Sequence, residues 1–308
     1  ERADGGHERV AVVRDVTRSD RRERAIDRQR KRLAALNDLN EVVRTVTDAV
    51  VLDNQDAGLN INGVSTGNQI TDVRASGNDP GIDIDSDATA NDLTGITATD
   101  NAGAGLAIIG ENTELTDSVA SDNGGTAGVD LVSSSRGQAN DSRIVNVTAN
   151  RNSGDGFYLN RPTNVTLADV TARNNTNGVY FFRASGNTVR NGTFRDNTDW
   201  AVGQDDFETL VNTVQNTDIG ASTAPETTLS AEVQNARLGP ASGPSANPNA
   251  TAIGRYVRVD AATPFDGRAA LRNVSLAYAA GDTTDAQNLT LWVEDGGWQF
   301  VPDSGVNT

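Results

Sequence analysis

The chain has 308 residues, with 42 Asp and Glu against 26 Lys and Arg, and a formal net charge of −16. This acidity argues against nucleic acid as a partner, because phosphate binding needs a basic surface. Cys and Met are absent and His occurs once, which excludes disulfides and metal centres with soft ligands. The sequence contains no run of about 18 apolar residues, the length that would predict a membrane-spanning helix.

Residues 1–45 differ in charge from the rest of the chain. They hold 12 basic and 9 acidic residues, a net charge of +3, so the remainder carries −19. Residues 9–17 alternate like a strand, and we expect a charged helix from Ser19 to Arg44. Apolar residues at heptad a and d positions of this helix predict a dimeric coiled coil, although Gln29 interrupts one d position. These apolar residues are Ile26, Leu33, Leu36 and Val43.

The same segment resembles the end of a PAS sensor domain and its linker in haloarchaeal signalling proteins. The resemblance rests on the alternating strand, on Arg14-Asp15-Val16-Thr17 and on the charged helix. It implies a sensor protein with a PAS-type module in a cytoplasmic setting. The alternative is that the helix caps the open end of the next domain, because terminal repeats must protect an apolar face.

Residues 46–238 are predicted to form one domain, in which a repeat runs to about residue 220 and Asn closes each short polar turn. The steps between these Asn residues are 24, 23, 22, 29, 23 and 22 residues. Gly and an apolar-any-apolar triplet follow most turns, as in Gly81-Ile82-Asp83-Ile84. A fixed period in this range indicates stacked supersecondary units. The Asn column consists of Asn54, Asn78, Asn101, Asn123, Asn152, Asn175 and Asn197.

Apolar residues eight, five and three positions before each Asn occur in short runs, which predicts strands and not helices. Stacked at ~4.8 Å, each coil buries the next, and equivalent Asn side chains can pair amide to amide. The pattern resembles the right-handed parallel β-helix family, shared by pectate lyases, polygalacturonases and NosD-like surface proteins. A leucine-rich horseshoe is the rival architecture, but the repeat leaves no room for a helix.

The predicted fold is therefore mainly β, a right-handed single-stranded parallel β-helix of about seven coils. It follows the N-terminal helix and precedes a small C-terminal antiparallel β domain. Residues 239–252, rich in Pro and Gly, are predicted to be a linker. Residues 253–308 are predicted to form the antiparallel module, with a hairpin turn at Asp295-Gly296-Gly297.

Two tyrosines suggest a ligand-binding face. Tyr158 and Tyr180 lie between inward apolar residues in successive coils, so we expect them to stack on the outer surface. Phe182 lies at the following turn, two residues after Tyr180, and Arg161 and Arg183 come three residues after Tyr158 and Tyr180. Exposed aromatic residues rimmed by polar groups are typical of interaction sites, here for a polysaccharide or cell-surface glycan. The alternative is that the C-terminal tail covers these rings.

Catalysis is a second hypothesis, of a polysaccharide lyase or glycoside hydrolase. Asn197-Thr198-Asp199 and Asp205-Asp206 are similar to polygalacturonase motifs, so Asp199, Asp205 and Asp206 are the candidate carboxylates. The Gly-His-Gly and Arg-Ile-Lys sequences that follow in that family are missing here. This difference favours a non-catalytic protein.

Calcium and glycans have weaker candidates. Asp83, Asp85 and Asp87 alternate along one strand and its turn, where their carboxylates can share the outer face and bind Ca²⁺, or form only a hydrated acidic surface. Asn140 and Asn249, in predicted loops, are the best of the eight Asn-X-Ser/Thr sequons. The others are Asn146, Asn164, Asn174, Asn191, Asn273 and Asn288.

The composition also indicates an origin and a location. One Lys against 25 Arg (26 − 1), together with abundant Asp, is similar to haloarchaeal proteins adapted to salt. We expect a fragment of a longer protein, located at the cell surface or outside the cell. The leading interpretation is a non-catalytic β-helix protein for adhesion or polysaccharide binding.

Overall fold

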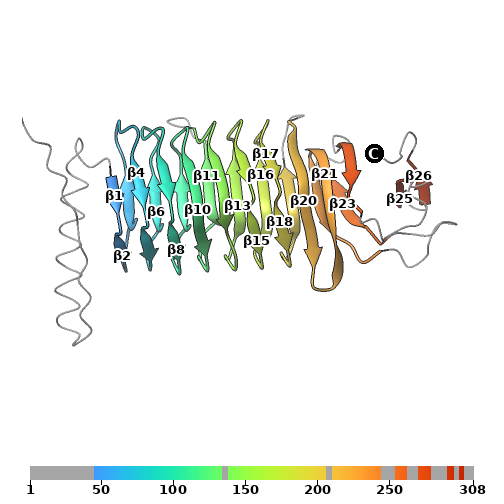
Figure 1. Cartoon of the computed structure of the whole chain (residues 1–308), viewed down its shortest axis with the longest axis horizontal. Coiled ribbons are helices and arrows are strands. Elements are labelled where there is room, and N and C mark those ends of the chain that lie inside the picture. The colour runs from blue at the N-terminus through green and yellow to red at the C-terminus, as the bar shows by residue number, and fades with distance from the viewer. Residues whose placement is uncertain are drawn as a thin grey trace, which may run out of the picture.

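The computed structural model describes residues 45–133, 138–205, 210–243, 254–261, 270–278, 290–294 and 298–301. Most of these residues form an elongated stack of coils (Figure 1). This part of the chain contains no helix, and therefore none long and apolar enough to cross a membrane. The predicted N-terminal helix, its coiled coil and the PAS-like strand fall outside the described residues, so the structure does not support them.

The described coils form a right-handed parallel β-solenoid of about 7 turns, as predicted, with three strand positions per coil. The first position is filled by β1 (Thr45–Thr47), β4 (Gln69–Thr71), β7 (Asp92–Thr94), β10 (Glu114–Ser121), β12 (Arg143–Thr148), β14 (Thr166–Ala168), β17 (Thr188–Arg190) and β20 (Asn212–Ala221). The second position is filled by β2 (Val50–Leu52), β5 (Arg74–Ser76), β8 (Thr97–Thr99), β15 (Thr171–Arg173) and β18 (Thr193–Arg195). The longer strands β10, β12 and β20 run through both positions, so all of these strands join, together with two later antiparallel strands, into one 15-stranded sheet.

The third position forms a separate nine-stranded sheet. Its parallel strands are β3 (Leu59–Ile61), β6 (Ile82–Ile84), β9 (Leu106–Ile108), β11 (Ala127–Val132), β13 (Asp155–Asn160), β16 (Asn177–Phe182) and β19 (Trp200–Asp205). They correspond to the apolar-any-apolar triplets of the repeat. From β6 onward, the middle residue of each triplet faces outward, because its two neighbours are buried in the core.

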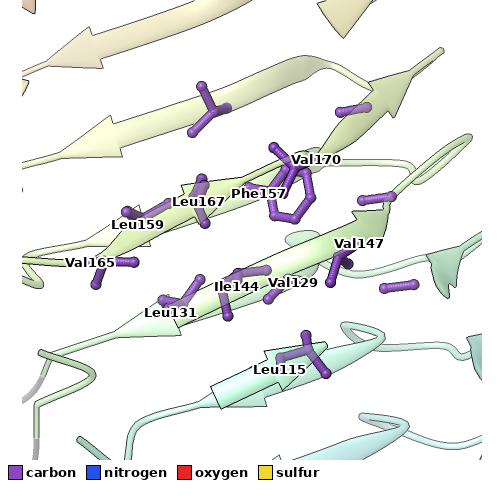
Figure 2. Close-up of a cluster of buried hydrophobic side chains, with 14 of the residues drawn as sticks. Leu115, Val129, Leu131, Ile144, Val147, Phe157, Leu159, Val165, Leu167 and Val170 are labelled. Atoms are coloured by element: carbon purple, nitrogen blue, oxygen red, sulfur yellow. The ribbon is translucent and has the colours of Figure 1, made fainter. Parts of the chain in front are cut away.

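The core is a set of apolar columns that run along the stack. Ile70, Leu93, Leu115 and Ile144 pair in register across four consecutive coils, and each is at most 1% exposed. Figure 2 shows Leu115 and Ile144 in the interior, together with Phe157 and Leu159 from the nine-stranded sheet. Each coil thus buries the apolar face of its neighbour, which a single repeat cannot do alone.

Left-handed backbone turns form the corner between the first and second strand positions. Asp72, Asp117 and Asn146 occupy this corner with φ of 54°, 49° and 53°. Asp and Asn adopt such angles more readily than most residues, which explains why the turns are rich in both. Gly95 fills the same corner with φ of 67°, and a Cβ there would lie 2.4 Å from Oδ1 of Asp72. The sequence pattern of the turns therefore follows from backbone geometry.

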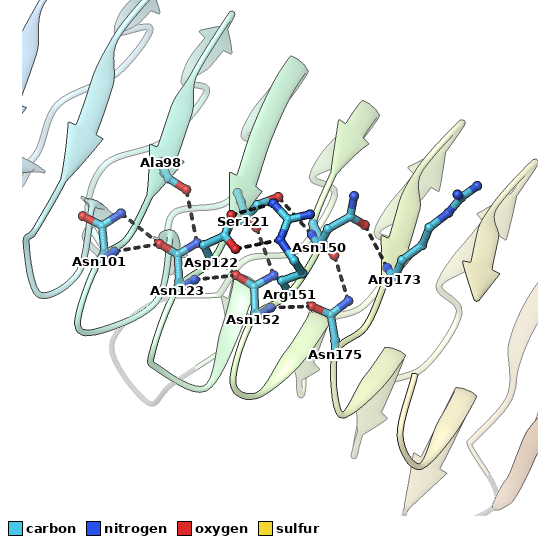
Figure 3. A network of polar contacts seen from close by, with 12 residues as sticks. Ala98, Asn101, Ser121, Asp122, Asn123, Asn150, Arg151, Asn152, Arg173 and Asn175 are labelled. Carbon is cyan, nitrogen blue, oxygen red and sulfur yellow. Dashed lines mark hydrogen bonds and ion pairs between the residues drawn. The ribbon is translucent and has the colours of Figure 1, made fainter. Parts of the chain in front are cut away.

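The Asn column forms a continuous ladder of amide hydrogen bonds (Figure 3). The Asn123 side-chain amide donates to Oδ1 of Asn152 at 3.0 Å and to the carbonyl oxygen of Ala98 at 3.1 Å. Its own Oδ1 accepts from the backbone and side-chain amides of Asn101, at 3.2 Å and 2.9 Å. All the hydrogen-bonding groups of this buried side chain are therefore satisfied.

A second polar column lies ten residues before the Asn column in each coil. This column was not predicted from the sequence. Asn68 donates to Asn91 at 2.6 Å, and Asn187 donates to Asn212 at 2.9 Å. Thr113 and Ser142 occupy the equivalent positions between these pairs. Its signal in the sequence is weaker because the residue type changes along the column.

The parallel stack ends where the chain reverses direction. β21 (Ala224–Gln234) pairs antiparallel with β20, and β22 (Ala236–Pro240) pairs antiparallel with β19. β23 (Val257–Ala261) and β24 (Ala270–Leu276) extend the two sheets by pairing with β22 and β21. Gly239 and Pro240, the first residues of the predicted linker, belong to β22.

The predicted C-terminal hairpin is present as an antiparallel pair of β25 (Trp292–Glu294) and β26 (Trp298–Phe300). Its turn, residues 295–297, lies outside the described part of the chain. The division into a linker at 239–252 and a separate module at 253–308 stays a prediction.

Candidate functional site

Tyr158 and Tyr180 stack on the outer face of the nine-stranded sheet. The two residues are direct partners in the register of β13 and β16, and their ring centroids are 6.0 Å apart with an interplanar angle of 19°. Both side chains are partly exposed, whereas the flanking Phe157, Leu159 and Phe181 are buried. We call this pair the tyrosine platform.

The next coil leaves room for the platform. Gly203 of β19 is the register partner of Tyr180, and a Cβ at this position would lie 2.6 Å from Cδ2 of the Tyr180 ring. Any side chain larger than hydrogen would therefore displace the ring. Gly203 occupies the same outward position as Tyr180 in the next coil, and its lack of a side chain leaves space for the Tyr180 ring.

A polar network holds Tyr180 in place. Its hydroxyl donates to Oδ2 of Asp205, and the same carboxylate is paired with the guanidinium of Arg237 at 2.9 Å. Burial, followed by the contact with Asp205, raises the pKa of the Tyr180 hydroxyl, which therefore stays protonated as a donor. Arg237 was not predicted from the sequence, because this residue lies on β22, beyond the last Asn of the column.

Two carboxyl groups adjoin the platform, and we call them the acid pair. Asp130 is the register partner of Tyr158 on β11, and Asp155 begins β13. Burial, with a smaller contribution from Asp155, raises the pKa of Asp130 to about 7. Burial also raises the pKa of Asp155 to about 6, with a smaller contribution from Asp199, although hydrogen bonds from Asn177 oppose the shift. Both groups would therefore carry less negative charge near neutral pH than ordinary aspartates.

The sequence reading noted Asp130 only as an outward residue and did not single out Asp155. The two residues are 25 positions apart (155 − 130), and the stacking of β11 on β13 brings them together. The signal that could have found them is the Asp that immediately precedes Gly156, next to the first outward tyrosine.

The other predicted ligand-binding residues surround the platform. Arg161 and Arg183 occupy equivalent left-handed turns after β13 and β16, with φ of 67° and 52°. The Arg183 guanidinium carbon lies 5.2 Å from the centroid of the Phe182 ring, a cation–π contact. Arg161 is exposed. The structure thus places Tyr158, Tyr180, Phe182, Arg161 and Arg183 on neighbouring strands and turns of one sheet.

The candidate catalytic carboxylates are not free to act as a pair. Asp205 is bound to Arg237 and Tyr180, whereas Asp199 is exposed at the turn before β19. Asp206 lies outside the described residues. Within the described chain, the carboxyl groups with raised pKa beside the aromatic rings are those of the acid pair.

The candidate calcium site is not assembled. In the described part of the chain, no group of three or more His, Cys, Asp or Glu side chains is placed to hold a metal ion. Asp83 lies on β6, whereas Asp85 and Asp87 are in the turn that follows. Burial, together with repulsion from Asp85, raises the pKa of Asp83.

The structure describes one of the two preferred sequons. The Asn140 amide donates to Oε1 of Gln138 at 2.5 Å, and its Oδ1 accepts from the backbone amide of Thr163 at 2.7 Å. Asn249, like Asn288, lies outside the described residues. Glycosylation of these sites stays a prediction.

Comparison with known proteins identifies the repeat. The family model of the right handed beta helix region matches residues 38–194 and 111–233, which together span more than half of the chain. The chain belongs to the right-handed beta helix family. No curated protein matches the sequence of this β-helix protein.

The comparison with solved structures includes two matches of low similarity. The A-module of a mannuronan C-5 epimerase from Azotobacter vinelandii matches with a TM-score of 0.43 and 15% identity. That match covers 57% of this chain and 53% of the module, so the β-helix protein spans about half of the module's length. The ORF18 protein of Geobacillus virus E2 matches with a TM-score of 0.28 and 11% identity, over 83% of this chain and 76% of the viral chain.

Proposed function

We propose that the outer face of the nine-stranded sheet binds a polysaccharide. The observation that carries this proposal is the tyrosine platform, in which two partly exposed rings stack on adjacent strands. Aromatic rings offer a flat apolar surface to the C–H face of a sugar, and nearby polar groups bind its hydroxyls. The two rings follow one another along the solenoid axis, so an extended polymer lying along this axis can contact both.

The rigidity of the site supports binding. Tyr180 is fixed by Asp205 and Arg237, and the strands that carry both tyrosines are paired on each side within the sheet. A ligand that meets pre-ordered rings loses less binding free energy to the ordering of side chains. A regular stack of strands is well suited to this task because its outward positions hardly move relative to one another.

The proposed role is adhesion or glycan binding without cleavage. The proposed location is the cell surface or the outside of the cell, in an organism that lives in concentrated salt. Asp205, a candidate for acid or base catalysis, is instead held in an ion pair with Arg237. The acidity of the chain supports the salt-adapted part of the proposal.

Affinity electrophoresis tests the proposed binding. Gels would contain a neutral, an acidic or an amine-bearing polysaccharide, and the wild type should be retarded by at least one of them. The double variant Tyr158→Ala, Tyr180→Ala should lose this retardation while its circular dichroism spectrum keeps the β signal. A wild type that no polymer retards would contradict the proposal.

A matched control and a second variant make the test specific. Val119→Ala with Thr148→Ala changes two register partners on the outside of the 15-stranded sheet and should leave the retardation unchanged. Tyr158→Ala alone keeps the contacts of Tyr180 with Asp205. It therefore tests the platform even if the double variant fails to fold.

A further inference from the structure

The chain contains four Asn-Gly sequences, in which the asparagine side chain can react with the backbone that follows it. Because glycine carries no side chain, nothing keeps its backbone nitrogen from approaching Cγ of the asparagine. The fold gives the four sequences different surroundings. They are Asn62-Gly63, Asn123-Gly124, Asn177-Gly178 and Asn191-Gly192.

Two of these asparagines are buried. Asn123 is 1% exposed and belongs to the Asn column, where its amide donates to Asn152 and Ala98. Asn177 is 6% exposed, and its amide donates to Oδ1 of Asp155 at 2.7 Å. Neither side chain can turn toward the following nitrogen without breaking a buried hydrogen bond, which would leave polar groups unsatisfied.

Asn191 is exposed, but hydrogen bonds hold it between two neighbouring coils. Its side-chain amide donates to Oδ1 of Asp169 at 3.0 Å, and its Oδ1 accepts from the amide of Asn216 at 3.0 Å. The backbone N–H of Asn191 also donates to the carbonyl oxygen of Gln215 at 3.0 Å, and Gly192 is buried. This asparagine is therefore fixed at both its side chain and its backbone.

Asn62, in the turn that follows β3, has the opposite surroundings. It is exposed, and in the part of the chain that the structure describes no hydrogen bond holds its side chain. The backbone bonds are local, because the Ser65 hydroxyl donates to the carbonyl oxygen of Asn62 at 3.3 Å and the Ser65 N–H donates to that of Gly63 at 2.7 Å. Val64, the next residue, is 90% exposed. The turn therefore projects into solvent with its asparagine amide free.

We propose that Asn62 is a site of spontaneous deamidation in the folded protein. The deprotonated backbone nitrogen of Gly63 attacks Cγ of Asn62, and the new N–Cγ bond closes a five-membered imide. The bond between Cγ and the side-chain nitrogen breaks, and this nitrogen leaves as ammonia with the proton that Gly63 lost. Water then opens the imide at either carbonyl, which gives aspartate or isoaspartate. No atom is oxidised or reduced, and water is the co-reactant.

The product changes the first coil of the stack. The new carboxylate lies opposite Asp85 in the register, because Ile61 pairs with Ile84, so it adds repulsion between acidic groups. Isoaspartate also lengthens the backbone by one methylene group, which shifts the turn that ends at Ser65. The Ser65 hydroxyl accepts from the amide of Asn68 at 3.3 Å, so the shift reaches the first member of the second polar column.

Incubation of the intact chain at pH 8, followed by proteolysis and mass spectrometry, tests the proposal. Each conversion replaces an amino group by a hydroxyl group and raises the mass of its peptide accordingly. In the folded protein Asn62 should convert at least tenfold faster than the other three asparagines. In guanidinium chloride the four rates should become similar, because unfolding removes the hydrogen bonds that hold the others. This comparison uses the wild type alone, so it holds whether or not any variant folds.

A variant and a matched control assign the reaction to this side chain. Asn62→Gln keeps the amide group, but its longer side chain must close a six-membered ring, so conversion at this position should fall at least tenfold. Asn112→Gln, at another exposed turn, should leave the conversion of Asn62 unchanged.

Two results would overturn the proposal. If Asn62 converts no faster than Asn191 in the folded protein, the turn does not allow ring closure and the site is not reactive. If the rate at Asn62 does not rise between pH 6 and pH 8, the reaction does not begin with loss of a proton from the Gly63 nitrogen.

Discussion

At the scale of single residues, the Asn column combines burial with complete hydrogen bonding. Each interior member donates to a carbonyl of the preceding coil and to the Asn of the next. The amide groups are inaccessible to water, so a missing partner leaves its neighbours unsatisfied. The column is therefore both a stabilising element and a point of vulnerability.

Replacement of Asn123 by Ala should destabilise the fold. The change removes the acceptor of both Asn101 amides and the donor to Asn152 and Ala98, which should cost about 1–3 kcal/mol in the free energy of unfolding. Urea denaturation followed by circular dichroism measures this loss. Asn62→Ala, at an exposed position outside the column, is the control and should change the stability by less than about 0.5 kcal/mol.

Residue-level features differ in how far the sequence predicts them. The Asn column was predictable because one residue type recurs at a nearly constant interval. The stacking of Tyr158 on Tyr180 was predictable because both occupy the same place in the repeat. The contact of Tyr180 with Asp205 and Arg237 was not, since Arg237 follows a reversal of the chain that no repeat unit encodes. The polar column with Asn68 and Asn91 was missed because its residue type varies.

The acid pair gives a testable dependence on pH. The pKa of Asp130 is raised to about 7 in the folded protein, whereas an aspartate in an unfolded chain titrates near ~3.9. The protonated group therefore contributes stability that is fully present below pH ~4 and is lost as the pH rises through about 7. Asp130→Asn should relieve this loss and raise the free energy of unfolding at pH 8 by about 1–3 kcal/mol.

Urea denaturation of the wild type and Asp130→Asn at pH 5, 6, 7 and 8 measures this effect. The difference between the two proteins should grow from pH 5 to about pH 7 and then level off, because above that pH the carboxyl group of the wild type is ionised in both the folded and the unfolded state. Asp92→Asn, at an exposed site, should show a constant difference from the wild type. A constant difference for Asp130→Asn as well would mean that its carboxyl group titrates normally.

At the scale of elements, the glycine that precedes most apolar triplets of the nine-stranded sheet allows the coils to approach one another. A Cβ on Gly128 would lie 2.5 Å from the carbonyl oxygen of Ala120 and 2.7 Å from Nδ2 of Asn152. The glycine therefore makes room for both the neighbouring backbone and the Asn ladder. The repeat predicted its position, and the structure shows what occupies the space.

Gly128→Ala should consequently lower the melting temperature. The added methyl group must displace backbone atoms and one rung of the ladder, at a cost of about 1–3 kcal/mol. Gly67→Ala is the matched control, because a Cβ there meets no heavy atom within 4 Å and only its φ of 69° opposes the change. Thermal unfolding by circular dichroism compares the two variants, and a loss in Gly128→Ala no larger than that in Gly67→Ala would contradict the expected steric cost.

Element prediction from the sequence was most successful where the repeat holds and least successful where it ends. The triplets before β19 set the strands of the nine-stranded sheet, because each inward residue must bury itself against the next coil. Beyond Asn197 apolar and polar residues alternate as in strands, but the sequence does not indicate which strands pair with each other. The antiparallel pairing of β21 with β20, and of β24 with β21, depends on tertiary contacts that a short apolar run does not specify.

At the scale of the whole molecule, repulsion between acidic surface groups acts against the stacking of the coils. Residues 46–308 carry a formal charge of −19, that is −16 less the +3 of residues 1–45. Each coil contacts only its neighbours, so repulsion between successive acidic turns acts against every interface of the stack. Salt screens this repulsion over a distance of about 10 Å at 0.1 M and about 3 Å at 1 M.

The melting temperature should therefore rise between dilute buffer and 2 M KCl, by about 5–10 °C if screening gains a few kcal/mol. Thermal unfolding in KCl, compared with sucrose at the same water activity, separates charge screening from a general exclusion of cosolvent. A rise in KCl alone supports adaptation to salt. A melting temperature that does not change with KCl would show that the acidic groups are too well hydrated or too far apart to repel, and the salt-adapted setting proposed for this β-helix protein would lose its physical basis.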